Sequence, residues 1–416
     1  MGQPIGRPSR VLYISYASPM NGRLGPARRH YHMVEQLSRF YDLRVLSIGA
    51  TSDAAVLGRT FAGVSRATFV EPARSAVPKH VRKLWSTLRG HCDFLPAAEP
   101  GLRRETRLLS SPAQCDAVLL SSVLLQRLPL AGGVPVIADT HNAEFDVLRR
   151  TTEFSDSWLR RQYASWQMRA MRDEEQRCGQ AVDLVLATSE RDRRVFEEEL
   201  ALPRVEVIPN GIDFAEFDPG ETPPSPGAIV FSGLMSYYPN QQAVRWFLDE
   251  IFPLILHRVP AARFVVAGAA PPRWLRARAS DRVAVTGRVP DIRPYLRMAS
   301  VVVVPLKIGG GTRVKILEAQ AMRRPVVSTA IGAEGLGLSH GESILLADRA
   351  HEFADSVVNL LGDGSQAARI ADGAWGHAAG HFSWTDIGAR LSGVLQSSIG
   401  LSARTDPLPE RKARVA

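Results

Sequence analysis

Short apolar runs alternate with helix-like patterns along most of this chain. The runs are rich in valine, isoleucine and leucine, and between them apolar residues recur at the spacing of an amphipathic helix. Continuous apolar runs are typical of parallel strands buried on both faces, and the pattern between them is typical of crossover helices. The predicted strands are residues 11–15, 43–48, 117–121, 134–138, 184–188 and 205–208, then 228–232, 263–267, 283–286, 301–305, 325–329 and 343–346.

Two sheets of this size predict an α/β protein with two doubly wound, Rossmann-like domains. We place the joint at Pro-Asn-Gly-Ile-Asp, residues 209–213, because Asn-Gly is a turn signal and the next stretch is rich in proline and glycine. The expected divisions are a first domain over 1–211, a second over 212–380, a terminal helix over 381–400 and a disordered tail over 401–416.

Composition narrows the classes of protein. The chain has 416 residues, of which 45% are hydrophobic, which is enough for two full cores. Its net charge of +9 suits an anionic substrate, an anionic membrane surface or a nucleic acid. The three cysteines show no Cys-x-x-Cys spacing, which argues against disulfides and structural zinc. There is no apolar leader and no apolar run of spanning length, so we expect a cytosolic location.

The most specific motif lies at residues 309–319, Gly-Gly-Gly-Thr-Arg-Val-Lys-Ile-Leu-Glu-Ala, directly after a predicted strand. A strand, a glycine-rich turn and a helix start form an anion-binding arrangement, because bare backbone approaches the ligand closely and first-turn amides point at it. We expect Gly310, Gly311 and Thr312 to contribute such contacts. The sequence therefore predicts that a phosphate group binds here.

Charged residues of the same motif support this prediction. Arg313 and Lys315 are expected in the first helical turn, where the helix dipole disfavours cations unless an anion neutralises them. Glu318 lies one turn later on the same face, so a surface Lys-Glu pair is the alternative. No Gly-Lys-Ser/Thr closes the loop and no Gly-x-Gly-x-x-Gly follows a strand, which excludes nucleotide-triphosphate loops and dinucleotide fingerprints.

This motif, with its continuation at 321–327, resembles the donor site of glycosyltransferase family 4, formerly group 1, which has the GT-B architecture. In that family a helix carries Glu-x7-Glu, and the second Glu, here Glu318, holds the ribose hydroxyls of a sugar nucleotide. The first Glu falls at Gly310, so the chain resembles the branch in which Gly-Gly-Gly-Thr-Arg replaces Glu-Gly-Phe-Gly. Residues 209–213 resemble the family's inter-domain hinge. The helix over 381–400 is implied to cross back to the first domain.

Polar residues after the strands of the first domain extend the resemblance, since ligands of doubly wound sheets lie beyond the strands' carboxyl ends. The loop 18–29, which contains Gly25, resembles the family's amino-terminal glycine-rich loop, although a plain strand-to-helix turn also explains it. His141 resembles the histidine that bonds a donor-sugar hydroxyl; a histidine satisfied by a helix cap is the alternative. The nearby residues Asp139, Asn142 and Glu144 also suggest a metal site, but no second cluster completes the coordination.

In the second domain, Gly233 and Asn240 belong to Gly-Leu-Met-Ser-Tyr-Tyr-Pro-Asn, which resembles the same branch of the family. Val289 follows the strand 283–286 in a stretch that resembles the lining of the nucleotide base. Glu334 stands in a loop that could supply the sugar contact absent at Gly310. We therefore expect all four residues to line the donor site.

The resemblance implies transfer of a hexose or related sugar from a nucleotide diphosphate-sugar to a hydroxyl acceptor, with retention at the anomeric carbon and with no metal or other cofactor. The acceptor is expected to be a glycan, a lipid-linked sugar or a small molecule in polysaccharide or other glycoconjugate synthesis. His141, Arg313 and Lys315 are the expected catalytic residues, because fixed cations would stabilise the departing diphosphate.

Residues 79–89 combine an apolar stripe with a basic face, which predicts a helix lying on an anionic membrane surface, or else a helix packed on the sheet. Two other functions stay open. A sugar-nucleotide epimerase would need acid and base carboxylates, for which Glu144 and Glu334 are candidates. A non-catalytic basic binding protein is the second, but the basic residues lack interleaved aromatics, so we expect no nucleic-acid partner.

Overall fold

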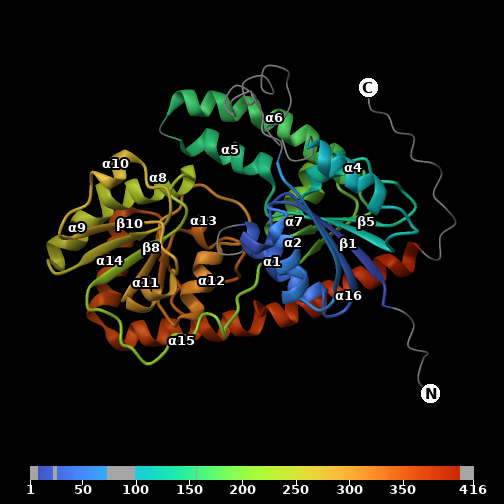
Figure 1. The fold of residues 1–416 in the computed structure, drawn as a ribbon. Coiled ribbons are helices and arrows are strands. Elements are labelled where there is room, and N and C mark those ends of the chain that lie inside the picture. The colour runs from blue at the N-terminus through green and yellow to red at the C-terminus, as the bar shows by residue number, and fades with distance from the viewer. Residues whose placement is uncertain (1–7, 22–25, 73–98, 156, 403–416) are drawn as a thin grey trace. The chain divides into compact units, whose positions relative to one another are not determined.

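The computed structural model describes residues 8–21, 26–72, 99–155 and 157–402 (Figure 1). The chain divides into two compact units. The first comprises Met1–Thr152, Leu159–Ile208 and Ile387–Ala416, and the second comprises Glu153–Trp158 and Pro209–Asp386. Gly25, the stretch 79–89 and the predicted tail beyond residue 402 lie outside the described residues.

The first unit is built on a seven-stranded parallel sheet with the order β3-β2-β1-β4-β5-β6-β7. The order reverses between β1 and β4, which creates a switch point where ligands bind beyond the strand ends. Six strands lie within two residues of their predicted bounds. The strands are β1 (Arg10–Ser15), β2 (Asp42–Ile48), β3 (Val64–Val70), β4 (Ala117–Leu120), β5 (Val136–Asp139), β6 (Leu184–Ala187) and β7 (Val205–Val207).

The prediction misses β3, which lies at the edge of this sheet. Ser65 and Arg66 of β3 are exposed, and only Val64 and Phe69 are buried. An edge strand covered on one face does not need the continuous apolar run that revealed the central strands. The helices of this unit are α1 (Pro26–Leu37), α2 (Ser52–Thr60), α4 (Pro100–Leu109), α5 (Glu144–Phe154), α6 (Trp158–Gln180), α7 (Glu190–Arg194) and most of α16 (Trp384–Ser402).

Helix α16 belongs to the first unit from Ile387 onwards, although it lies at the far end of the sequence. The Tyr41 hydroxyl donates to the carbonyl oxygen of Ser392 over 2.9 Å, and Gly388 lies against Gln36 of α1. The helix runs through Ser402, so the start of the predicted tail is helical. The chain's carboxyl-terminal helix is thus part of the first unit's packing.

The second unit contains a six-stranded parallel sheet with the order β10-β9-β8-β11-β12-β13. All six strands were predicted. They are β8 (Ala228–Ser232), β9 (Arg263–Ala267), β10 (Val283–Gly287), β11 (Val301–Val304), β12 (Val326–Ser328) and β13 (Leu345–Leu346). The helices are α8 (Tyr238–Trp246), α9 (Phe252–Arg258), α10 (Arg273–Arg276), α11 (Arg293–Met298), α12 (Val314–Ala321), α13 (Ala330–Ala333), α14 (Ala350–Gly362) and α15 (Gly364–His381).

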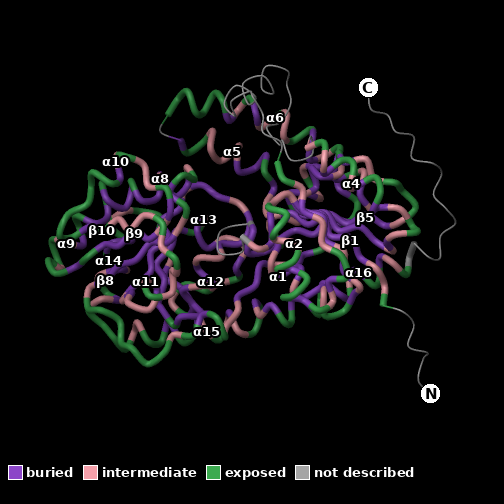
Figure 2. The backbone as a smooth tube through the Cα atoms, in the orientation of Figure 1, coloured by how far each residue is buried: buried purple, intermediate pink, exposed green. Residues whose placement is uncertain are grey.

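Each sheet forms the buried centre of its unit, as the strands in Figure 2 show. The four valines of β11 are fully buried, and in the same core Phe247 packs against Phe264 with tilted rings whose centroids are 4.4 Å apart. Because both faces of a parallel sheet are covered, polar side chains can gather only at the strand ends. The fold therefore leaves those ends to carry the chemistry.

Two further findings concern the predicted class of protein. Cys115 and Cys178 are buried thiols that form no disulfide among the described residues, and the thiol of Cys178 donates to Oε1 of Glu174 over 3.7 Å. Among the described residues, no helix combines the length and the apolar character needed to cross a membrane.

Candidate functional site

The glycine loop of the second unit connects β11 to α12 and is organised around Arg313. Its guanidinium donates to the carbonyl oxygens of Gly310 and Gly311, and to that of Ile331 over 3.2 Å. A Cβ on Gly309 would lie 2.7 Å from the guanidinium, and Gly311 has a φ of +64°. The glycines therefore let the backbone wrap closely around the arginine side chain.

This arrangement corrects the placement of Arg313 in the first helical turn. The helix starts at Val314, and Arg313 precedes it with a non-helical backbone (φ −82°, ψ 86°). The side chain is only 7% exposed and is directed to the loop carbonyls. In this conformation Arg313 shapes the glycine loop, and its contact with Ile331 ties that loop to α13, which Glu334 follows.

Lys315 does lie in the first turn of α12, and two other predicted site residues lie around it. Its Nζ donates to Oδ1 of Asn240 over 2.9 Å and lies 4.1 Å from the Phe231 ring centroid. A Cβ on Gly233 would be 3.0 Å from this nitrogen. The ends of β8 and the starts of α8 and α12 thus bring Gly233, Asn240 and Lys315 together.

The surroundings of Lys315 weaken its hold on a proton. Burial, and then the charge of Arg313, lower the pKa of Lys315 from 10.5 to about 7, while Glu318 acts in the opposite direction. A bound anion would raise this pKa again, because an opposite charge favours the ammonium form. Lys315 is therefore matched to a negatively charged ligand.

Three other predicted residues have less defined surroundings. Glu318 is half-buried on α12, one turn after Lys315. Val289 and Glu334 are both half-buried and follow β10 and α13, respectively. The predicted roles of these three residues in binding a nucleotide-sugar stay predictions.

In the first unit, His141 follows β5 and forms a pair with His30 of α1. Their Nε2 atoms are 3.1 Å apart, and Nδ1 of His30 is 3.2 Å from the carbonyl oxygen of Ala17. The ring of Tyr16 stands edge-on to both imidazoles. Burial lowers the pKa of each histidine to about 3, so both rings are neutral at pH 7.

His141 also lines a pocket of about 290 Å³ that lies within the first unit. The pocket is found at the ends of β1, β4 and β5, where the sheet order reverses. Its walls combine hydroxyl and carboxyl groups with apolar side chains. The lining residues are Tyr16, Ser122, Val123, Leu124, Thr140, His141, Asn142, Glu144, Met171 and Glu175.

Comparison with protein families decides the identity. The family described as "Glycosyltransferase Family 4" matches residues 25–216, and the family described as "Glycosyl transferases group 1" matches residues 226–363. Together these matches cover most of the chain. The chain belongs to glycosyltransferase family 4.

Individual relatives of this family 4 glycosyltransferase are distant. The D-inositol 3-phosphate glycosyltransferase of Stackebrandtia nassauensis is 28% identical over 57% of this chain and 60% of its own. The lipopolysaccharide core mannosyltransferase LpcC of Rhizobium leguminosarum is 25% identical over 57% of this chain and 68% of its own. An uncharacterized 44.6 kDa protein from the cps region of Klebsiella pneumoniae is 24% identical, and the match spans 39% of its length.

Solved structures support the GT-B fold. Anabaena HepE, determined in complex with UDP and glucose, has a TM-score of 0.65 at 14% identity, covering 94% of this chain and 100% of HepE. Sucrose-phosphate synthase from Thermosynechococcus elongatus has a TM-score of 0.69 at 15% identity, covering 94% of this chain and 100% of its own. The two doubly wound units have the GT-B type of fold.

The polar cluster that suggested a metal site is used internally in this glycosyltransferase. Arg29 binds Asp139 through two hydrogen bonds of 2.8 and 2.6 Å, and Asn142 donates to Glu144 over 2.6 Å. Arg29 also donates to the carbonyl oxygen of Ile208 over 2.8 Å. Within the described ranges, no group of three or more His, Cys, Asp and Glu side chains could hold a metal ion.

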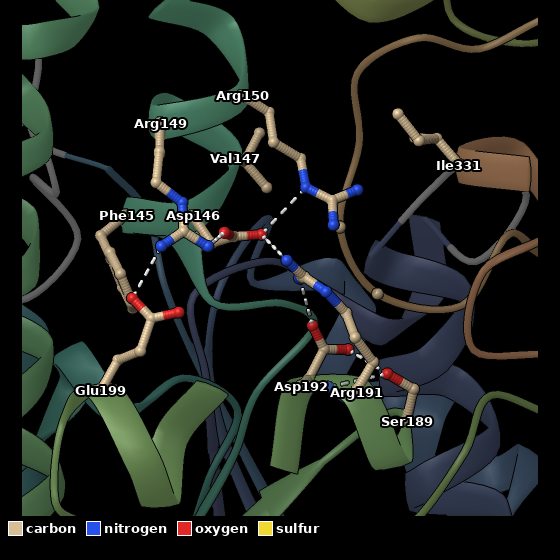
Figure 3. Close-up of polar contacts among 12 residues, drawn as sticks. Phe145, Asp146, Val147, Arg149, Arg150, Ser189, Arg191, Asp192, Glu199 and Ile331 are labelled. Atoms are coloured by element: carbon tan, nitrogen blue, oxygen red, sulfur yellow. Dashed lines mark hydrogen bonds and ion pairs between the residues drawn. The ribbon is translucent and has the colours of Figure 1, made fainter. Parts of the chain in front are cut away.

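A buried ion network holds the helix that follows His141 (Figure 3). Asp146 of α5 is fully buried and forms ion pairs with Arg149 and Arg150 of its own helix and with Arg191 of α7. Glu175 of α6 accepts hydrogen bonds of 2.9 Å from the backbone amides at the start of α5. These contacts fix the first turn of α5, which borders the pocket.

Sequence reasoning missed several residues of these sites, chiefly Arg29, His30, Phe231 and Glu175. His32, two residues after His30 on α1, instead lies 2.9 Å from Glu35. One signal was available. His30 shares a helical face with the buried residues Met33, Val34 and Leu37, and a polar residue on an apolar face calls for a buried partner.

Proposed function

We propose that this protein transfers a sugar from a nucleotide diphosphate-sugar to a hydroxyl acceptor in glycoconjugate synthesis. The observation that carries this proposal is Lys315, held by Asn240 at the start of α12 within the region that matches the group 1 family. The names of two relatives specify sugar transfer, and HepE binds UDP. A cation, a helix start and a glycine loop at one strand end suit a diphosphate.

The proposed reaction places a growing negative charge beside Lys315. As the sugar leaves with oxocarbenium character, the diphosphate becomes more anionic, and fixed donors stabilise this charge without reorganising. Amides at Gly310–Thr312 would add to the ammonium, with Arg313 holding their loop in place. In this proposal the chain belongs to the branch with Gly-Gly-Gly-Thr-Arg, and His141 bonds the donor sugar.

We propose further that the reaction retains the anomeric configuration and needs no metal. Purified protein should be incubated with nucleotide-sugars of differing base and sugar, with and without excess EDTA. We expect product of retained configuration by NMR and a rate that the chelator leaves nearly unchanged. Inverted product would overturn retention, and a rate that collapses with EDTA and returns with Mg²⁺ would overturn the metal-free mechanism. Isomerised donor without acceptor would favour an epimerase.

Glu318 is proposed to hold the ribose hydroxyls of the donor. Glu318→Gln should weaken binding of the preferred nucleoside diphosphate by roughly ten- to 150-fold, because hydrogen bonds to a charged group contribute about 1.5–3 kcal/mol. Titration calorimetry measures this change. Glu352→Gln is the matched control, since Glu352 is 49% exposed on α14 of the same unit. Equal affinity in both variants would reject the ribose assignment.

We propose that α6 provides a surface for an anionic membrane; the stretch 79–89, for which the sequence predicts that role, lies outside the described residues. Leu159, Tyr163 and Trp166 are 63%, 41% and 45% exposed, and their spacing places them on one helical face. Arg160 and Arg169 are also exposed, and their spacing places one on each side of this face. Aromatic and leucine side chains flanked by arginines suit the interface of an anionic bilayer.

Vesicle sedimentation tests this surface. Wild-type protein should bind phosphatidylglycerol-containing vesicles, more weakly as salt rises, and should bind pure phosphatidylcholine poorly. The double variant Leu159→Ser and Trp166→Ser should lose most of that binding. Leu254→Ser removes another exposed leucine, 42% exposed on α9, and should leave binding unchanged. Binding that survives the double variant would reject α6 as the membrane surface.

A further inference from the structure

The hydrogen bonds of His30 and His141 allow one arrangement of protons. A carbonyl oxygen accepts only, so Nδ1 of His30, 3.2 Å from the Ala17 oxygen, must carry a hydrogen. A neutral imidazole has one N–H, so Nε2 of His30 is bare and accepts. The contact of 3.1 Å between the two Nε2 atoms then requires the hydrogen to be on His141. His141 is left with a bare Nδ1.

The surroundings support neutral rings in fixed orientations. Two imidazolium rings with nitrogens 3.1 Å apart would repel each other, and burial disfavours the charged form of both. The ring of Tyr16 stands at 89° to both imidazoles, with centroids 5.0 Å and 6.2 Å away. The hydroxyl of Thr188 donates to the backbone oxygen of His141 over 3.0 Å, which fixes the loop that carries the ring.

The pocket that His141 lines offers both acceptors and donors of hydrogen bonds. Carboxyl groups come from Glu144 and Glu175, hydroxyls from Tyr16, Ser122 and Thr140, and an amide from Asn142. Val123, Leu124 and Met171 provide an apolar wall against which the C–H face of a ring can pack. Of the pocket's lining residues in the described part of the chain, none is lysine or arginine. Such a pocket suits a neutral ligand that bears hydroxyl groups.

We propose that His30 is a positioning residue that fixes His141 as a hydrogen-bond acceptor, and that this pocket binds a neutral, hydroxyl-bearing ring and rejects its phosphorylated form. This inference rests on the proposed sugar transfer and specifies the chemical class of one substrate ring. A phosphate in the pocket would meet the carboxyl groups of Glu144 and Glu175, which repel an anion when they are ionised. Burial raises the pKa of Glu144 to about 7 and that of Glu175 to about 8, so this repulsion grows as pH rises above 7. One relative is named for inositol 3-phosphate, which supplies a phosphorylated ring as a probe.

The proton arrangement can be measured without any turnover. Long-range ¹H–¹⁵N NMR of ¹⁵N-histidine-labelled full-length protein at pH 7 should show His30 protonated at Nδ1 and His141 at Nε2, both neutral. His32, which contacts Glu35 instead, serves as the internal reference. A hydrogen on Nε2 of His30, or a charged ring in either histidine, would overturn the proposed arrangement of protons.

Two substitutions separate positioning from simple packing. His30→Gln can still donate to the Ala17 oxygen and accept from His141, so it should keep the His141 tautomer. His30→Leu fills similar space without either bond and should give a mixture of His141 tautomers. If the protein turns over, His30→Leu should raise the KM of the substrate whose ring the pocket binds more than it lowers kcat, and His30→Gln should restore both. Identical His141 spectra in the two variants would overturn the role of His30.

Ligand class is tested with myo-inositol and myo-inositol 3-phosphate, a matched pair that differs by one phosphate. We expect myo-inositol, or methyl α-D-glucopyranoside as a second neutral probe, to shift the His141 ring signals, and the phosphate to bind at least about tenfold more weakly. Glu144→Gln should reduce this difference. Tighter binding of the phosphate at His141, or no shift with either neutral probe, would overturn the pocket assignment. If the neutral probes bind at His141 but the wild-type protein transfers no sugar, the proposed transfer and not the pocket assignment would be wrong.

Discussion

Replacing Lys315 with glutamine should lower the turnover number by roughly ten- to a thousandfold, the range for removing one donor to a developing anion. Asn240 and Phe231, which hold the ammonium, are both uncharged. Neither of them can replace the positive charge that the substitution removes. Steady-state kinetics on the preferred donor measure the change. A variant that turns over normally would show that Lys315 is a structural residue.

The same substitution should not destabilise the protein without ligand. The pKa of Lys315 is about 7 in the folded protein and 10.5 ordinarily, so the unfolded chain binds the proton more tightly. Between these values, the free energy of unfolding of the wild type rises with pH. The loss of folding stability caused by burying the charged Lys315 is therefore largest below pH 7. The variant should be equally or more stable at pH 6, and this advantage should fade towards pH 10. Urea unfolding at pH 6 and 9.5 tests the sign.

The affinity for the nucleotide should depend on whether Lys315 is protonated. Because the ammonium form attracts a diphosphate, the wild type should bind nucleoside diphosphate more weakly as pH rises from 6 to 9. The Lys315→Gln variant, which cannot titrate there, should show a much flatter profile. Parallel profiles in the two proteins would contradict the assignment of Lys315 to the diphosphate.

Replacing Arg29 with methionine should lower the free energy of unfolding by about 3–5 kcal/mol, the cost of leaving a buried charge without its partner. Arg29 is 2% exposed and Asp139 is fully buried, and they share two hydrogen bonds between α1 and the end of β5. Arg29 also bonds the carbonyl of Ile208, so the substitution removes a contact to a third segment. Urea denaturation of the full chain measures the loss.

Two further variants identify the cause of that loss. The double variant Arg29→Met and Asp139→Leu should recover much of the stability, because it removes the unpaired charge as well. Arg193→Met breaks a pair whose side chains are 37% and 60% exposed and should change stability little. If the double variant were no more stable than Arg29→Met alone, lost packing and not the buried carboxylate would be the cause.

The pattern of neighbouring residues in the sequence predicted those elements whose structure depends mainly on neighbouring residues. The central strands were predicted because strands covered on both faces are continuously apolar, whereas the edge strand β3 was missed for lack of that run. The glycine loop was predicted because a strand, glycines and a helix start follow one another in the chain. The same continuity placed Lys315 and Glu318 on one helix.

The direction in which a side chain points could not be predicted from neighbouring residues in the sequence. Arg313 was expected to face a phosphate, but its backbone precedes the helix and its guanidinium bonds the carbonyls of the glycine loop. The run of glycines has two explanations, an anion or a close arginine; the structure shows the arginine, and the anion stays a prediction. The low pKa of Lys315 likewise depends first on burial, which only the folded unit creates, and then on the charge of Arg313. Its contacts with Phe231 and Asn240 join segments that lie more than seventy residues away in the sequence.

By itself, the sequence determined the two parallel-sheet units, the family and the helix that carries Lys315 and Glu318, because apolar periodicity and contiguous motifs are local properties. Only the tertiary structure decided which polar groups meet. His30 and His141 are 111 residues apart in the sequence, and Arg29 and Asp139 are 110 residues apart. Such contacts arise because parallel strands from distant segments end at one edge of a sheet.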